Sequence, residues 1–165
     1  MIFNLIGGGS NVASKFPEFT YTGTYELIDD GIAADGKTQN WRIKFLTSGV
    51  FTPTKIVDRI DVFCVGGGDA GTEWYSSERA SGGGSGYTTT SLNRIITKNM
   101  PITITIGAGG NPGGVSGGTT SVACNMWTDS ASGGVGRNGG SGGSAYGGNY
   151  VPGSNGASSQ SGGTG

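Results

Sequence analysis

Residues 60–68 read Ile-Asp-Val-Phe-Cys-Val-Gly-Gly-Gly, and the character of the sequence changes at this point. Before it, apolar and polar residues alternate as they do in ordinary strands. After it, glycine recurs in runs and charged residues become rare. Within 60–65, apolar side chains at both even and odd positions predict a strand that is buried on both faces. The sequence therefore predicts a β-structured part joined to a glycine-rich part.

The composition excludes several classes of protein. The chain has 165 residues, of which 36 are glycine and 13% are charged, with a net charge of −1. Such a chain lacks the basic surface that binds nucleic acid or anionic lipid. Its apolar runs are shorter than a membrane span requires. We therefore expect no nucleic-acid partner and no insertion into a membrane.

The sequence contains no histidine, the commonest general base and transition-metal ligand. No nucleophile–base pair is visible without it, so we expect no enzymatic activity, no catalytic residue, no metal site and no cofactor. The two cysteines, Cys64 and Cys124, lie in apolar strand-like segments and not in a Cys-x-x-Cys pair. Buried free thiols are the default interpretation, and a disulfide is the alternative.

Alternation of apolar and polar residues predicts a fold that is mainly β, with almost no α-helix. We expect an antiparallel, jelly-roll-like β-sandwich over residues 19–132, after an N-terminal leader or tether (1–18) and before a glycine-rich tail (133–165). The predicted strands are 19–28, 40–51, 59–65, 86–92, 101–106 and 119–124. The predicted core consists of Phe19, Tyr21, Trp41, Ile43, Phe45, Val62, Cys64, Ile102, Ile104 and Ile106.

Two stretches formally match nucleotide-binding motifs. Neither is followed by the secondary structure that phosphate binding requires. Gly31, Gly36, Lys37 and Thr38 fit GxxxxGK[ST], but a phosphate cradle must open a helix, and residues 41–46 are β-patterned. We expect a hairpin loop there, in which Asp29, Asp30 and Asp35 form a solvated turn rather than a calcium site. Gly66, Gly68 and Gly71 fit GxGxxG, but no helix and second strand follow at the required distance. We predict no nucleotide site.

A hydrophilic loop, 69–81, lies between two glycine runs and has Trp74 and Tyr75 at its centre. Aromatic residues on a loop either anchor it to the body of the protein or contact a partner. The second alternative gives a candidate receptor-binding loop made of Glu73, Trp74, Tyr75, Glu78 and Arg79.

From residue 133 onward, glycine recurs every third residue, at Gly133, Gly136, Gly139 and Gly142. Three residues per turn is the period of the polyproline-II helix, and glycine lets such helices pack backbone to backbone. We expect packed polyglycine-II-like helices here. The alternative is a flexible Gly/Ser linker.

Several of these stretches closely resemble a glycine-rich domain of phage and prophage virion proteins. The resemblance covers about residues 19–148, and its specific parts are 40–49 (NWRIKFLTSG) and 60–68 (IDVFCVGGG). It implies a minor structural or tail-associated virion protein and brings no catalytic motif. The family tends to close with a short apolar strand after the glycine tail. Because residues after Gly148 do not supply one, we expect a fragment of a longer product.

Two functions follow from the resemblance. The first is a tail-fibre or tail-tip component that is made in the cytoplasm of the bacterial host, is carried in the virion tail and binds a bacterial surface glycan. The second is a purely structural virion or appendage subunit that contacts only other assembly proteins. In both, the expected partners are other virion proteins and further copies of the chain, most simply as a homo-trimer.

Overall fold

The computed structural model describes residues 2–5, 16–36, 39–55, 59–70, 83–112, 115–135 and 150–151. These residues form strands and extended segments, with no helix among them, which confirms the prediction of a mainly β fold. The strands are β1 (Ile2–Leu5), β2 (Phe19–Tyr21), β3 (Tyr25–Ile32), β4 (Gln39–Phe45), β5 (Gly49–Pro53), β6 (Arg59–Val65), β7 (Thr88–Ile95), β8 (Ile102–Thr105), β9 (Thr120–Ala123), β10 (Thr128–Ala131) and β11 (Tyr150–Val151). No helix in this part of the chain is long and apolar enough to cross a membrane.

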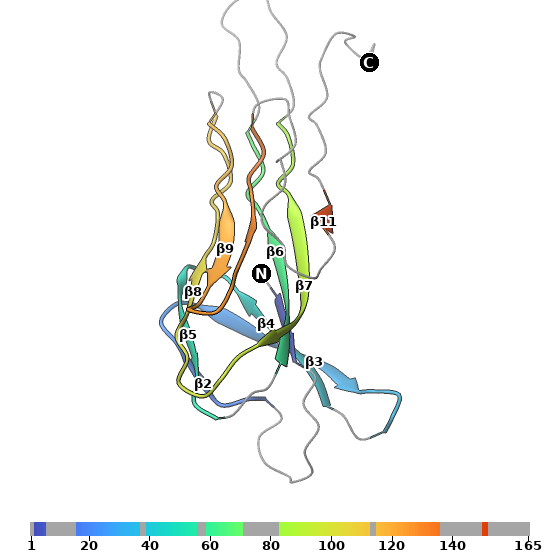
Figure 1. Ribbon diagram of the computed structural model, residues 1–165. Coiled ribbons are helices and arrows are strands. Elements are labelled where there is room, and N and C mark those ends of the chain that lie inside the picture. The colour runs from blue at the N-terminus through green and yellow to red at the C-terminus, as the bar shows by residue number, and fades with distance from the viewer. Residues whose placement is uncertain are drawn as a thin grey trace, which may run out of the picture.

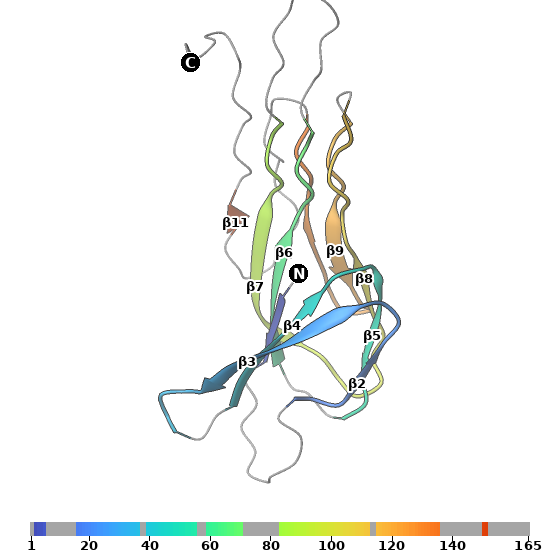
Figure 2. The same ribbon diagram turned by 180° about the vertical axis from the view of Figure 1, so that it is seen from behind.

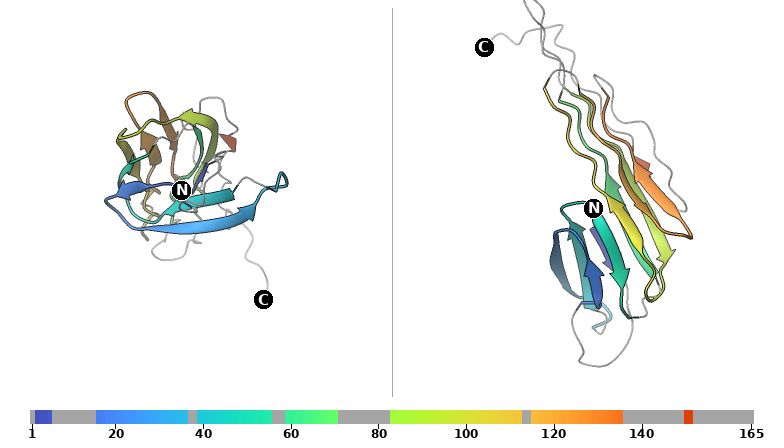
Figure 3. Two further views of the ribbon diagram at one scale, coloured as in Figure 1. Left: turned by 90° about the horizontal axis from the view of Figure 1, so that it is seen from below. Right: turned by 90° about the vertical axis from the view of Figure 1, so that its left-hand side faces the viewer.

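The strands form two antiparallel sheets, which agrees with the predicted sandwich. Sheet A has the order β11-β7-β6-β1-β4-β3, and sheet B has the order β10-β9-β8-β5-β2. Figures 1 and 3 show the sheets as two layers, from which extended segments continue upward beyond β6, β7, β8, β9 and β10. The molecule is therefore elongated along the direction of these strands.

The core lies between the two sheets and contains most of the residues that alternation predicted. Trp41, Ile43, Phe45, Val62, Cys64, Ile102 and Ile104 are all buried. Phe19, Tyr21 and Ile106 are half-buried and pack against this core. Further core residues are Phe51, Ile60, Tyr87, Ile96, Met100, Val122 and Ala131.

Two predicted strands are each divided by a corner at which the chain changes sheets. Residues 19–28 contain β2 of sheet B and β3 of sheet A, and residues 40–51 contain β4 of sheet A and the start of β5 of sheet B. The corners pack on each other, since a Cβ on Gly49 would lie 2.8 Å from the amide nitrogen of Gly23. The Thr24 N–H donates to Thr47 Oγ1 at 2.8 Å across the contact. Only glycine allows the two backbones to approach this closely.

The structure differs from the prediction of an N-terminal tether. Ile2–Leu5 form β1, which lies inside sheet A between β6 and β4. It pairs antiparallel with both, with Phe3 opposite Ile43 on β4 and Val62 on β6. The short apolar run at residues 2–5 therefore belongs to the sheet, and a pairing this distant in sequence is not visible in local alternation.

The β3–β4 hairpin confirms the interpretation of the first nucleotide-like motif. The two strands pair antiparallel on either side of the loop, with a bulge between Asp29 and Gly31. Gly31 and Gly36 have φ angles of 77° and 67°, which glycine adopts without strain. Figure 2 shows this hairpin projecting from the side of the sandwich. No strand-to-helix phosphate loop exists among the described residues of this segment.

Besides β1, two more strands were absent from the sequence-based prediction. β10 pairs with β9 in sheet B, and β11 pairs with β7 in sheet A. Because β11 is the short strand Tyr150–Val151, the expectation that no closing strand follows Gly148 is wrong. A two-residue strand has too few residues for alternation to be recognised.

Candidate functional site

The most unusual part of the structure is a bundle of five extended segments that continue from the strands of the sandwich. They are residues 66–69, 83–87, 107–111, 115–118 and 132–135, and we call them the glycine bundle. In Figure 1 they run side by side above β6–β10.

Hydrogen bonds in the glycine bundle radiate in several directions. Within segment 66–69, Gly66 N–H donates to Tyr87 O at 2.9 Å and Gly67 N–H donates to Gly118 O at 2.9 Å. Carbonyl groups of the same segment accept from Gly110 N–H at 2.7 Å and Gly134 N–H at 2.9 Å. Segment 66–69 thus bonds to all four other segments, whereas a strand in a sheet bonds to neighbours in one plane.

The bundle is held together without side chains in its centre. A Cβ on Gly67 would lie 2.0 Å from Ala108 O, and one on Gly117 would lie 2.0 Å from Gly67 O. Gly66, Gly84, Gly133 and Gly134 are buried. Backbone therefore packs directly on backbone, which requires glycine because any larger residue would overlap a neighbouring carbonyl group.

The bundle shares three features with packed polyglycine-II-like helices: extended chains, hydrogen bonds to several neighbouring segments and glycines at the close contacts. The sequence predicted such helices from Gly133 onward. Gly133 and Gly134 do lie inside the bundle, but residues 136–149 are outside the described part of the chain. Most of the bundle consists of earlier glycine runs, at 66–68, 107–110 and 117–118, which lie within the predicted sandwich domain, 19–132.

Away from the sandwich, segments of the glycine bundle end where the described residues stop. Residues 71–82, 113–114 and 136–149 come next in the chain and lie outside the described part. They include the whole predicted receptor-binding set, Glu73, Trp74, Tyr75, Glu78 and Arg79. Of the described residues at this end, Val115 and Val135 are 51% and 56% exposed.

The second nucleotide-like motif lies in the bundle. Gly66 and Gly68 belong to segment 66–69, and the chain remains extended to Ala70 instead of opening a helix. Among the described residues, no group of three or more His, Cys, Asp or Glu side chains could hold a metal ion.

A buried ion pair connects the two sheets and was not predicted from the sequence. Arg94 Nε on β7 donates to Asp129 Oδ2 on β10 at 2.9 Å, and Ser91 Oγ donates to Asp129 Oδ1 at 2.9 Å. Arg94 also lies over the ring of Trp127, 5.2 Å from its centroid. Asp129 is fully buried. One feature of the sequence could have drawn attention to Asp129: it and Arg137 are the sole charged residues in 100–165.

Cys64 lies close to this pair and is a free thiol, as is Cys124. Burial, together with the charge of Asp129, raises the pKa of Cys64 to about 12. A thiol that stays protonated is a poor nucleophile, so this cysteine is a packing residue. Both thiols are free, as the default interpretation predicted, but Cys64 is buried whereas Cys124 is half-buried.

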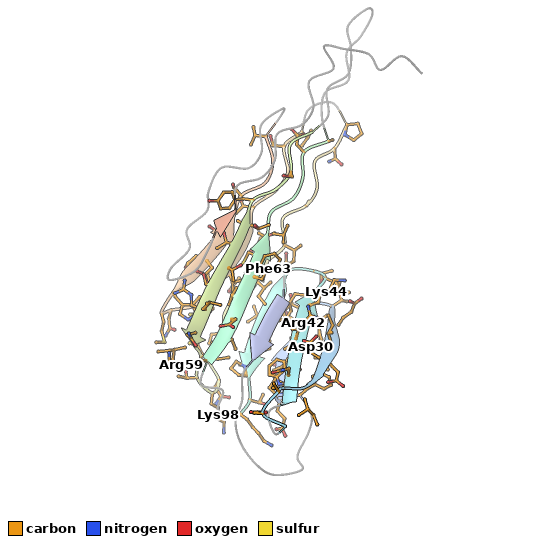
Figure 4. All side chains as sticks on the ribbon, turned by 90° about the vertical axis from the view of Figure 1, so that its right-hand side faces the viewer. Asp30, Arg42, Lys44, Arg59, Phe63 and Lys98 are labelled. Carbon is orange, nitrogen blue, oxygen red and sulfur yellow. The ribbon has the colours of Figure 1, made fainter. Side chains whose placement is uncertain are left out.

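The outer face of sheet A is a second exposed surface. Val65, Leu92 and Ile95 are between 41% and 48% exposed, and they lie on the neighbouring strands β6 and β7. Toward the other edge, Arg42 donates to Asp30 at 2.7 Å and Lys44 donates to Glu26 at 3.1 Å. Figure 4 shows Phe63 on this face and Asp30, Arg42 and Lys44 together beside it. The hydrogen bond from Arg42 lowers the pKa of Asp30.

Comparison with known proteins gives one match. No curated protein and no solved structure matches the chain. A family model described as a glycine-rich domain matches residues 46–165, a stretch that contains β5–β11 and every segment of the glycine bundle. This chain therefore belongs to that family of glycine-rich domains.

Proposed function

We propose that the protein is a tail-fibre or tail-tip component of a phage virion and that it binds a bacterial surface glycan. The observation that carries the proposal is the glycine bundle, whose segments 66–69, 107–111 and 132–135 lead in the sequence toward three connections, residues 71–82, 113–114 and 136–149. A bundle fixed by backbone hydrogen bonds does not depend on the side chains of the connections. These connections can therefore differ in sequence while their supporting structure stays the same.

The composition of the connections suits a glycan. Residues 71–82 carry Trp74 and Tyr75 among serines, and residues 136–149 carry Tyr146 among glycines, serines and asparagines. Aromatic faces stack on sugar rings, and hydroxyl and amide groups bond sugar hydroxyls. The assignment to a virion tail rests on the resemblance of residues 19–148 to virion proteins.

The test is adsorption of virions that carry variant protein. Trp74→Ala should reduce adsorption to host cells at least tenfold and leave the melting temperature within about 1 °C, because the change is confined to a connection. Met126→Ala, an exposed residue of the β9–β10 turn, is the matched control and should change neither quantity. Normal adsorption by Trp74→Ala virions would contradict the receptor-binding role. A fall of several degrees in the melting temperature would identify Trp74 as an anchor.

The outer face of sheet A favours a second function, that of a purely structural subunit. The exposed side chains of Val65, Leu92 and Ile95 suit contact with another assembly protein. Electron microscopy of virions that lack the protein distinguishes the two functions. Intact particles that fail to adsorb support receptor binding, whereas incomplete particles support the structural role.

A further inference from the structure

We propose that the free edge of β3 is a docking site for an extended segment of a partner protein, in which basic and apolar residues alternate. The segment adds to sheet A as a further strand. This inference goes beyond glycan binding, because the partner is a protein and the site lies in the sandwich. It rests on the order of the strands, the direction of the backbone groups of β3, and the exposure and charge of its side chains.

The two sides of the sandwich differ. On one side β10 closes against β7, where Thr89 Oγ1 donates to Ser130 O and Tyr87 N–H donates to Ser132 O, both at 2.9 Å. On the other side, β3 ends sheet A and β2 ends sheet B in the described part of the chain. Of these two edges β3 is the longer, with eight residues against three. Figure 2 shows β3 at the outside of the molecule, where it leads into the projecting hairpin.

The backbone groups of β3 point alternately toward β4 and away from it. Leu46 N–H donates to Thr24 O at 2.9 Å, so Thr24 belongs to a hydrogen-bonded pair with β4. Such pairs recur at every second residue of an antiparallel ladder, which makes Glu26 the next residue bonded to β4. The N–H and C=O groups of Tyr25 and Leu27 therefore face the free edge, where they can pair with an added strand.

The side chains of β3 differ in character between its two faces. Tyr25 and Leu27 lie on the face toward sheet B, where the ring of Tyr25 meets that of Phe19 on β2 at 5.1 Å between centroids. Both are nevertheless 41% exposed. On the opposite face, the side chains of Glu26 and Asp30 are 53% and 28% exposed. A strand added at this edge therefore meets apolar side chains on one face and carboxylates on the other.

The charges determine which kind of strand can pair here. On the outer face β4 is basic, and its Arg42 and Lys44 bond the carboxylates of β3. A basic strand beyond β3 continues this alternation of sign, and opposite charges on neighbouring strands stabilise a sheet. A second copy of β3 brings two acidic strands together, so it is not the partner. The bulge between Asp29 and Gly31 ends the regular edge and limits the site to residues 24–28.

The first experiment titrates the protein with a fluorescein-labelled peptide, acetyl-Thr-Lys-Val-Lys-Val-Lys-Thr, and follows fluorescence anisotropy. We expect saturable binding of this peptide and none of the analogue with glutamate at each lysine. Leu27→Pro should weaken binding at least about tenfold, because proline lacks the N–H that faces the partner. The fold should persist, since β4 does not use that N–H.

Leu27→Ala is the matched control, because it shortens the same side chain and keeps the N–H. It should bind the lysine peptide within about threefold of the parent protein, since it loses part of one apolar contact. Melting temperatures of both variants are measured alongside. Absence of saturable binding to the parent protein, or equal affinities of Leu27→Pro and Leu27→Ala, would overturn the proposal.

A second variant tests the charge and leaves the backbone unchanged. Glu26→Lys replaces an exposed side chain and should shift the melting temperature by no more than about 2 °C. It should bind the lysine peptide at least about fivefold more weakly than the parent protein does, and it should bind the glutamate analogue, because the sign of the edge is reversed. An unchanged preference for the lysine peptide would contradict the proposed charge selection.

Amide hydrogen exchange, followed by NMR, then locates the peptide on the protein. At saturating lysine peptide, the amides of Tyr25 and Leu27 should exchange at least about tenfold more slowly, because they become hydrogen-bonded. The amides of Glu26 and Ile28 already bond to β4 and should change less. Protection that leaves out Tyr25 and Leu27 would show that the peptide binds elsewhere and would overturn the proposal.

Discussion

At the scale of single residues, Arg94 and Asp129 show how one backbone irregularity creates a buried site. Ile60 pairs with Arg94 and Val62 pairs with Ser91, so β7 has one residue more than β6 between these pairs. The backbone accommodates the extra residue at Asn93, whose φ is 57°. The Asn93 N–H donates to Asp61 Oδ1 at 2.9 Å. The bulge turns both Ser91 and Arg94 inward, where regular alternation would have separated them.

Replacing Asp129 should be costly for stability. Asp129→Asn leaves the buried Arg94 without a countercharge and should lower the free energy of unfolding by about 3–5 kcal/mol, measured by urea denaturation. Asp30→Asn breaks the exposed pair with Arg42 and should cost at most about 1 kcal/mol. Equal, small losses for both variants would show that the buried pair contributes no more than a surface pair.

Cys64 should make stability depend on alkaline pH. Its pKa is raised from 9.0 to about 12 by burial and by Asp129, so the folded chain retains a proton that the unfolded chain loses. The stabilisation is complete below pH 9 and is lost as pH rises from 9 to 12. The denaturation midpoint should therefore fall more steeply with pH in the parent protein than in Cys64→Ala. Identical slopes would contradict a raised pKa.

At the scale of elements, the segments of the glycine bundle continue the strands of the sandwich. They pack differently from those strands, because glycine has no side chain. β6 to β10 pair in sheets, whereas the glycine segments that adjoin them bond in several directions. Side chains hold the two sheets apart in the sandwich. Where glycine replaces them, the layers can approach until backbone meets backbone, and hydrogen bonds then form between layers as well as within them.

Neighbouring glycines of one segment should respond differently to alanine. Gly67→Ala places a methyl group 2.0 Å from Ala108 O and should lower the free energy of unfolding by about 3 kcal/mol, because backbone must move. Gly68→Ala is the matched control, since its Cβ would meet nothing closer than Gly84 O at 3.8 Å. Gly68→Ala should leave the free energy of unfolding unchanged or raise it by up to about 1 kcal/mol, because alanine lowers the conformational entropy of the unfolded chain.

Chemical denaturation of both variants, with the parent measured in parallel, tests this difference. Tolerance of alanine at both positions would mean that the segments are further apart than the bundle requires.

At the scale of the whole molecule, a β-sandwich carries an elongated bundle that buries little apolar surface. Ordering glycine is entropically expensive, and the bundle has hydrogen bonds rather than side chains to offset that cost. In residues 100–165 the two charges are Asp129 and Arg137, and Asp129 is buried against Arg94. Little electrostatic repulsion therefore opposes close approach of another copy along this part.

We predict that the protein forms a homo-oligomer, most simply a trimer. Edge strands of both sheets and the outer segments of the bundle can pair with further copies, which stabilises the ordered glycines. The preference for three subunits rests on the resemblance to tail proteins. Light scattering on the purified protein at micromolar concentration gives the mass directly. A monodisperse, folded monomer would contradict this prediction.

The sequence by itself determined the β class, the central strand at 60–65 and most of the core, because alternation at period two reports which side chains face inward. It also predicted the hairpin around residues 31–38, since a β-patterned stretch rather than a helix follows the glycines. For the candidate site, it identified glycine as the basis of backbone packing and assigned that packing to residues from Gly133 onward.

Only the tertiary structure decided which glycine segments come together, where the chain changes sheets, and that β1 and β11 join sheet A. The physical reason is that glycine has no side chain, so a glycine segment carries no pattern that reveals its neighbours. The partners of segment 66–69 are determined by the strands that lead into the bundle. Long-range pairing, such as Arg94 with Asp129, likewise arises from strand register rather than from local sequence.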